Sequence, residues 1–258
     1  MEVTPDVRVF LFRKAILKIS SIPVVLGSQD TVALFPFYAR FIFPSSEMEE
    51  VFRNIDHIYI YRDYEIFADF VPEKCWRILD IGAYIGLYTV RSARLVGNCG
   101  RVYSFEANPW IFSYLARNVA LNRLKNVRMY NLAVGSEFGE KELYVGESMV
   151  NSSLLKEYVK YMSEISFIGR VRVVPLDFIL DKLGFVDLLK IDVEGLEEKI
   201  ISSSKTLIPE NVKRVVVEAH PPLTYSASIS RLLEERGYKV VTYSPEGVCN
   251  QTFIYAIA

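Results

Sequence analysis

The sequence predicts an α/β protein built on a mainly parallel sheet with helices on both faces. From about residue 71 onward, short apolar stretches typical of strands alternate with longer helical stretches, as in repeated βα units. Acidic residues or glycines follow several of the apolar stretches, at the edge where parallel sheets bind ligands. A chain of 258 residues is long enough for one large domain with a buried core.

The predicted elements follow one another in a regular order. Strands are expected at 77–81, 101–105, 127–132, 186–192 and 213–218. Helices are expected at 87–96, from Pro109 to about 122, and at 228–236. Gly97 and Gly237 mark the ends of two of these helices. Residues 238–243 and 251–257 predict a closing antiparallel pair of strands.

Two parts of the chain lack this alternation of strands and helices. Within 136–174, residues 140–145 and 170–174 predict strands of a small side sheet, with a polar segment and a short amphipathic helix between them. Residues 1–70 lack βα repetition and are rich in aromatic side chains. We therefore divide the chain into an N-terminal cap or substrate region, 1–70, and a main domain, 71–258.

Charge and cysteine content narrow the range of possible functions and cellular locations. The 30 basic and 31 acidic residues give a net charge of −1, which argues against a nucleic-acid binder driven by counterion release. Cys75, Cys99 and Cys249 are odd in number and widely spaced, so neither a disulfide framework nor a four-cysteine zinc site is expected. These features favour a reducing, cytoplasmic location.

Residues 8–27 form an apolar stretch near the N-terminus. Four basic residues interrupt it, so it is too charged to span a bilayer, and it lacks the layout of a signal peptide. We expect an amphipathic helix docked on the main domain. Peripheral contact with a membrane surface is the alternative, because basic residues beside Phe and Leu suit an interfacial helix.

The first candidate binding element is the predicted strand-to-helix turn Asp80–Gly86. Glycines there let the backbone pass close to a ligand, and the following helix N-terminus favours a carboxylate or phosphate. The spacing is Gly-x-x-x-Gly, whereas nicotinamide and flavin folds use Gly-x-Gly-x-x-Gly. Asp80 disfavours a pyrophosphate and suits a ligand with an ammonium group. Taken alone, the turn is equally consistent with a tight connection that binds nothing.

Glu106 is the second candidate, at the end of the next predicted strand. A carboxylate at this position can accept hydrogen bonds from both hydroxyls of a ribose. The alternative for a lone acid at a strand end is a solvated or capping residue. Together, Asp80 and Glu106 indicate a ligand with an ammonium group, a ribose and no pyrophosphate, which points to S-adenosylmethionine.

A resemblance to a known family rests on five motifs in a fixed order. They are Asp80-Ile-Gly-Ala83, Phe105-Glu-Ala-Asn-Pro109, Asn131-Leu-Ala-Val-Gly135, Leu176-Asp177 and Lys190-Ile-Asp-Val-Glu-Gly195. The chain thereby resembles the FkbM family of S-adenosylmethionine-dependent methyltransferases over roughly 70–220, with Tyr84 where the family usually has Asn. The resemblance implies a class I methyltransferase (Rossmann-like) fold with a seven-stranded, mostly parallel sheet. It also implies methyl transfer to a hydroxyl of a sugar, a glycolipid or a related small molecule.

The expected site residues form two groups. Cofactor binding is expected from Asp80, Gly82, Ala83, Tyr84, Gly86, Thr89, Glu106, Ala107, Asn108, Leu132, Ala133 and Asp192. Catalysis is expected from Lys190, Asp192, Glu194 and His220, with His220 or a neighbouring carboxylate taking the acceptor's proton.

Other roles stay open for several of the expected catalytic residues. Lys190 and Asp192 share one face of a strand, so they can form a buried ion pair. Glu194 can be an acid at a helix N-terminus, and His220 a loop histidine with a packing role. His57, the other histidine, has no motif around it. No metal is expected, although an oxygen-rich cation site is the alternative for Asp177, Asp192, Glu194, Glu218 and His220.

Two other functions remain as rivals. A nucleic-acid methyltransferase is suggested by a basic cluster at Arg117, Arg123, Lys125 and Arg128, but the Asp/Asn-Pro-Pro-Tyr/Phe motif of base-amine methyltransferases is missing after the fourth strand. The second rival is a non-catalytic scaffold that binds S-adenosylmethionine. The sequence indicates neither the acceptor nor the oligomeric state.

Overall fold

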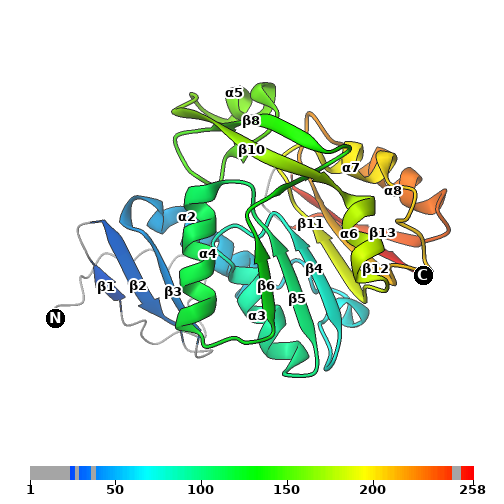
Figure 1. Ribbon diagram of the computed structural model, residues 1–258, viewed down its shortest axis with the longest axis horizontal. Helices are drawn as coiled ribbons and strands as arrows, with labels where there is room; N and C mark the ends of the chain where they lie inside the picture. The colour runs from blue at the N-terminus through cyan, green and yellow to red at the C-terminus, as the bar shows by residue number, and fades with distance from the viewer. Residues whose placement is uncertain (1–23, 27–28, 36–38, 246–250) are drawn as a thin grey trace.

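The computed structural model describes residues 24–26, 29–35, 39–245 and 251–258. Its centre is a seven-stranded sheet in the order β13-β14-β12-β11-β4-β5-β6 (Figure 1). The strands are β4 (Arg77–Ile81), β5 (Arg101–Phe105), β6 (Val127–Tyr130), β11 (Leu188–Ile191), β12 (Arg214–Ala219), β13 (Lys239–Tyr243) and β14 (Thr252–Ile257). Only β14 runs antiparallel to its neighbours. The predicted mostly parallel seven-stranded sheet, with its final antiparallel pair, is confirmed.

The side chains of the central strands point alternately into two hydrophobic cores, one on each face of the sheet. On one face, Ile78, Leu188 and Val216 pack with α3 (Leu87–Val96) and α4 (Pro109–Leu121). On the other face, strand residues such as Leu189 pack with α6 (Leu176–Leu183), α7 (Glu197–Ser203) and α8 (Ser226–Glu234). Burial on both faces explains why these strands are almost continuously apolar.

The predicted boundaries differ from the structure in a few places. The strand expected at 127–132 ends at Tyr130, and the one expected at 186–192 spans only 188–191. Helices α6 and α7 were not predicted, because eight and seven residues are too few for a readable helical period. Helix α4 begins as expected, with Pro109 in its first turn and the Asn108 side chain accepting from Trp110 N.

A second sheet lies above the carboxyl ends of the central strands (Figure 1, top). Its order is β7-β10-β8-β9, formed by β7 (Ala133–Gly135), β8 (Gly139–Val145), β9 (Ser152–Ser153) and β10 (Phe167–Pro175), with α5 (Lys156–Met162) beside it. It confirms the predicted side sheet and its short helix.

The N-terminal part packs against the face covered by α3 and α4. It contains β1 (Val24–Leu26), β2 (Asp30–Leu34), β3 (Arg40–Pro44), η1 (Ser45–Glu47), α2 (Met48–Ile55), the π-helical η2 (Asp56–Tyr61) and η3 (Ala68–Phe70). Asn118 of α4 ties β3 to the main sheet, since its amide pairs with the backbone of Ile42 and donates to Ile85 O.

Most of the apolar stretch 8–27 lies outside the described residues, so the helix expected there is not assessed. Its residues 24–26 form strand β1, contrary to the predicted helix. Pairing with β2 stabilises this extended segment. Across the described ranges, no helix combines the length and apolar character that a bilayer crossing needs.

Cys75 and Cys99 form a disulfide, which contradicts the expectation from cysteine spacing. Cys75 precedes β4 and Cys99 precedes β5, and the pairing of these adjacent strands brings the two cysteines together. Spacing along the chain could not reveal this proximity. Disulfides are rare in reducing compartments, with intracellular proteins of hyperthermophiles as an exception. The bond therefore weighs against the cytoplasmic location expected from the sequence.

Candidate active site

Loops after four neighbouring strands border one cavity of about 1260 Å³. Gly82 follows β4, Glu106 follows β5 and Asp192 follows β11, while Glu218 and His220 lie at the end of β12. This is the carboxyl edge of the sheet, where open α/β folds bind their ligands. Of the expected cofactor residues, Gly82, Tyr84, Glu106, Ala107, Leu132, Ala133 and Asp192 line the cavity.

The glycine turn has a shape that only glycine permits. Gly82 has φ +77°, and a Cβ there would lie 1.6 Å from the carbonyl oxygen of Asp192. Gly86 has φ +90°, and its Cβ would lie 2.6 Å from Cδ1 of Leu115. Gly82 therefore brings the loops after β4 and β11 into contact and leaves room for a ligand beside the backbone.

Asp80 stabilises this turn through buried contacts and does not line the cavity. It is fully buried, and it accepts a hydrogen bond of 2.6 Å from Thr89 Oγ1. Lys190 Nζ lies 3.5 Å from Asp80 and donates to Gly82 O at 2.8 Å. The direct cofactor contact expected of Asp80 and Thr89 does not fit this burial. Ala83, Gly86 and Asn108 likewise lie outside the cavity lining.

Glu106 is held with its carboxylate in the cavity wall. Tyr84 N donates to Oε2 and Asn108 N donates to Oε1, each at 2.8 Å. Each oxygen keeps a further lone pair for a ligand hydroxyl. Burial raises the pKa of Glu106 to about 7. The pair of oriented acceptors fits the two hydroxyls of a ribose, and this fit supports the expected binding of S-adenosylmethionine here.

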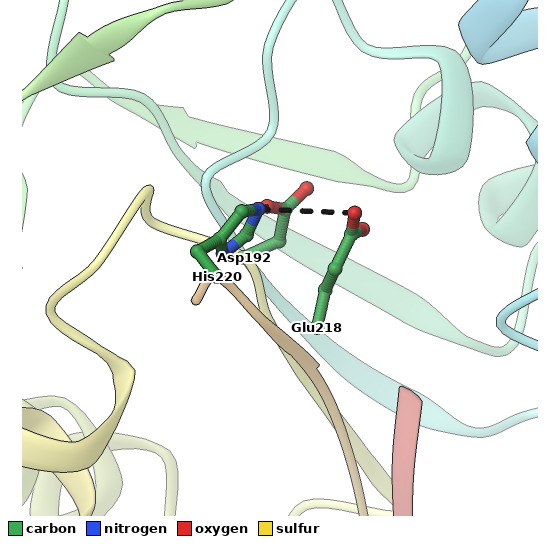
Figure 2. A group of neighbouring side chains, drawn as sticks. All are labelled: Asp192, Glu218 and His220. Carbon is green, nitrogen blue, oxygen red and sulfur yellow. Dashed lines mark ion pairs between the residues drawn. The ribbon is translucent and has the colours of Figure 1, made fainter. Parts of the chain in front are cut away.

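Asp192, Glu218 and His220 lie close together, as Figure 2 shows, and all three line the cavity. Nε2 of His220 lies 3.6 Å from Asp192 Oδ1 and 3.8 Å from Glu218 Oε1. A third carboxylate, Glu194, lies 3.5 Å from the same nitrogen. The three residues of Figure 2 offer donor atoms within 4.8 Å of one another, a donor set that suits a divalent cation. Catalysis without a metal stays a prediction.

Lys190 forms the buried ion pair with Asp192 that the strand pattern allowed. Its Nζ lies 3.1 Å from Oδ2 of Asp192. Burial alone would raise the pKa of Asp192, but the charges of Lys190 and His220 outweigh it and lower the pKa. Asp192 is therefore an ionised hydrogen-bond acceptor at neutral pH.

Glu197, which the sequence analysis did not single out, holds the ring of His220. Its Oε1 lies 2.9 Å from His220 Nδ1, and Thr224 donates to its Oε2 at 3.0 Å. Burial disfavours a charge on His220, but Glu194 and Glu197 outweigh it and raise its pKa well above the usual value. No signal in the sequence marked Glu197, since helix α7, which begins at this residue, was not predicted.

Two of the alternative roles that the sequence left open do not hold. Glu194 is not in the first turn of a helix, because it has φ +58° in the loop and α7 begins at Glu197. Its carboxylate instead accepts from the Tyr158 hydroxyl, and burial raises its pKa to about 8. Asp177 does not belong to a cation site, since its carboxylate accepts from Ser204 and Thr206 in another loop.

The N-terminal part adds Tyr64 to the acidic cluster formed by Asp192, Glu194 and Glu218. No sequence motif indicated this tyrosine. The hydroxyl of Tyr64 donates to Asp192 Oδ2 at 3.0 Å and also contacts Glu218. His57 and Asp63 line the same cavity. The only sequence signal was the density of aromatic residues in this region.

Comparison with known proteins agrees with the geometry of the cavity. The model of the methyltransferase FkbM domain matches residues 80–240. The chain belongs to the FkbM methyltransferase family. The matched range contains Gly82, Glu106, Asp192 and His220 but leaves out Tyr64.

Relatives and solved structures extend this result. Methyltransferase sdnD of Sordaria araneosa is 30% identical over 221 residues, which cover 72% of this chain and 84% of that protein. Methyltransferase 1 of Beauveria bassiana is 28% identical, covering 82% and 89%. An S-adenosylmethionine-dependent O-methyltransferase from Thermotoga maritima shares the fold, with a TM-score of 0.50 at 14% identity and coverage of 91% and 84%. This FkbM methyltransferase therefore has the class I fold and uses S-adenosylmethionine.

Proposed function

We propose that this methyltransferase transfers the methyl group to a hydroxyl of a sugar, a glycolipid or a related small molecule. The observation that carries the proposal is the position of Asp192. Its ionised carboxylate faces the same cavity as the oriented Glu106, so a cofactor anchored on Glu106 and an acceptor held by Asp192 would meet inside it. S-adenosylmethionine supplies a methyl on a positively charged sulfur, a good leaving group.

The proposed roles follow from the hydrogen bonds of each residue. Glu106 holds the ribose, and the turn at Gly82 lets the cofactor approach the backbone. Lys190 fixes the carboxylate of Asp192, which aligns the acceptor hydroxyl. His220, charged and held by Glu197, offsets the negative charges of Asp192 and Glu194. Alignment of this kind contributes about 7–11 kcal/mol to lowering a barrier.

The lining of the cavity supports an uncharged, hydroxylated acceptor. Acidic side chains such as Glu50, Asp56 and Asp63 repel phosphates, which disfavours nucleic acid. Aromatic side chains such as Tyr61 and Tyr161 are exposed and can stack on a sugar ring. Because several of these residues precede position 71, we assign 1–70 as the substrate region and 71–258 as the methyltransferase domain.

Incubation with methyl-labelled S-adenosylmethionine and panels of glycans, glycolipids and small polyols tests the proposal. We expect label in a hydroxylated acceptor, as a methyl ether located by mass spectrometry. Transfer to RNA, or to a nitrogen atom in preference to every hydroxyl, contradicts it. An absence of transfer to all panels while the cofactor binds favours the non-catalytic scaffold. A cytoplasmic location and membrane contact through 8–27 stay predictions.

A further inference from the structure

A second histidine lines the cavity from outside the matched family domain. Nδ1 of His57 lies 2.5 Å from Oδ2 of Asp63. Asp63 is fully buried, and its other oxygen, Oδ1, has no hydrogen-bond partner in the part of the chain that the structure describes. A buried acceptor without a partner is costly, so the contact with His57 is the hydrogen bond that the described residues offer to this carboxylate.

The segment that carries Asp63 is anchored on both sides. The carboxylate of the next-but-one residue, Glu65, accepts from Arg91 of α3 at 2.7 and 2.6 Å and from Arg62. The hydroxyl of Tyr255 in β14 donates to the backbone carbonyl of Asp63. Tyr64, adjacent to Asp63, reaches Asp192. The pair of His57 and Asp63 is thereby fixed next to the acidic cluster.

This arrangement prepares His57 to accept a proton. A carboxylate on Nδ1 keeps that nitrogen protonated and leaves the lone pair of Nε2 available. Within the described ranges, Nε2 of His57 has no hydrogen bond to another side chain or to the backbone. The ring is about one quarter exposed, at 24%, and lines the cavity.

His220 is less suited to this task. Its Nδ1 contacts Glu197, and its Nε2 faces Asp192, Glu194 and Glu218. Such surroundings favour the imidazolium, which has no lone pair to accept a proton. Around His57, burial disfavours the charge, whereas Asp63, Glu218 and Asp56 raise the pKa of its ring. Among them, the carboxylate of Asp63 contacts the ring directly.

We propose that His57, oriented by Asp63, is a further catalytic residue that accepts the proton of the acceptor hydroxyl. This proposal rests on the proposed O-methylation. The acceptor oxygen forms a bond to the methyl carbon while the carbon–sulfur bond breaks, and its electron pair stays on sulfur. The hydroxyl proton passes to Nε2 of His57, and the imidazolium pairs with Asp63. Charge balances, because the positive sulfur becomes neutral as the ring becomes positive.

An NMR titration tests the orientation without any acceptor. The chain has two histidines, so His220→Gln leaves His57 as the only imidazole. With S-adenosylhomocysteine bound, we expect neutral His57 to carry its proton on Nδ1. Asp63→Asn should lower its pKa by about one unit or more, as for loss of a paired charge. A neutral ring with the proton on Nε2 overturns the proposal, whether or not a hydroxyl acceptor is found.

Kinetics with the best acceptor of the panels tests the chemical role. His57→Gln should lower kcat by about 10²–10⁴-fold and abolish the acidic limb of the pH profile of kcat, measured at saturating S-adenosylmethionine so that the pH dependence of binding through Glu106 does not contribute. The Kd of S-adenosylhomocysteine should be unchanged. Asp63→Asn should move that limb to lower pH, and Asp69→Asn, an exposed change on the same segment, should do neither. Wild-type kcat and pH profile in His57→Gln overturn the proposal, as does loss of S-adenosylhomocysteine binding. Failure of hydroxyl acceptors overturns the proposed function instead.

Discussion

At the residue scale, the environment of Glu106 makes cofactor binding depend on pH. Burial raises its pKa to about 7, whereas the ribose hydroxyls need the ionised form as acceptor. We therefore expect affinity for S-adenosylhomocysteine to rise as the pH increases through about 7 and then to level off. In the free protein, protonated Glu106 contributes stability that is fully present below its unfolded pKa of 4.5. This contribution is lost as the pH rises through the folded pKa of about 7.

Calorimetric titrations on both sides of pH 7 measure this effect. Glu106→Gln should show weak binding without the rise, because its amide does not ionise. A wild-type affinity that stays constant across this window contradicts the assignment of Glu106 to the ribose.

Asp192 is expected to matter for the chemical step. Asp192→Asn removes the charge that aligns the acceptor hydroxyl, so the turnover rate should fall by about 10²-fold or more. The Kd for S-adenosylhomocysteine should stay near the wild-type value. Asp181→Asn, the same change at an exposed position of α6, is the control. Equal turnover by both variants on the true acceptor would exclude Asp192 from the reaction.

Sequence motifs predicted several polar and glycine residues on the main-domain side of the cavity, but not most of its lining. Gly82, Glu106, Asp192 and His220 each follow the last residue of a strand, and strand ends of a parallel sheet can be located in sequence. Tyr64, His57 and Asp63 could not be predicted, because they reach the cavity from a segment without βα repetition. Burial of Asp80 also escaped prediction, since it depends on Lys190 from another strand.

At the scale of elements, the contact between the loops after β4 and β11 depends on Gly82. Gly82→Ala places a Cβ against the Asp192 carbonyl and also strains a backbone with positive φ, which alone costs about 1–2 kcal/mol. We expect lower stability together with a loss of affinity for S-adenosylhomocysteine, measured by thermal unfolding and calorimetry.

Gly97→Ala provides a matched control. Gly97 also has positive φ, at +67°, but a Cβ there meets nothing within 4 Å. It should lower stability while leaving the Kd unchanged. If both variants bind S-adenosylhomocysteine like the wild type, the turn at Gly82 is not part of the cofactor site.

At the scale of the whole molecule, the disulfide between Cys75 and Cys99 constrains the unfolded chain. It closes a loop of 24 residues, so Cys75→Ser should lower the free energy of unfolding by about 3 kcal/mol under oxidising conditions. Denaturant unfolding with and without reductant measures the difference, and the variant should be insensitive to reductant. Free thiols at both positions in protein isolated without reductant would instead support the reducing, cytoplasmic location.

Most strands of the central sheet could be located from their apolar runs, whereas the count of seven came from the family resemblance and the strand order from the structure. The attachment of the N-terminal part was not, since Asn118 and the aromatic packing of this region act across the whole chain. In our proposal the cavity has a cofactor side at Glu106 and an acceptor side at Asp192 and His220. The sequence motifs predicted these residues, whereas only the three-dimensional structure defines what the N-terminal part adds.

Calorimetry with S-adenosylhomocysteine on three proteins tests this division of the cavity most directly. The wild type should bind, and Glu106→Ala should bind more weakly by about 1.5–3 kcal/mol, the worth of hydrogen bonds to a charged group. His220→Ala should bind like the wild type, because His220 lies on the acceptor side. Unchanged affinity in a folded Glu106→Ala protein, or a loss of binding in His220→Ala alone, would contradict the account.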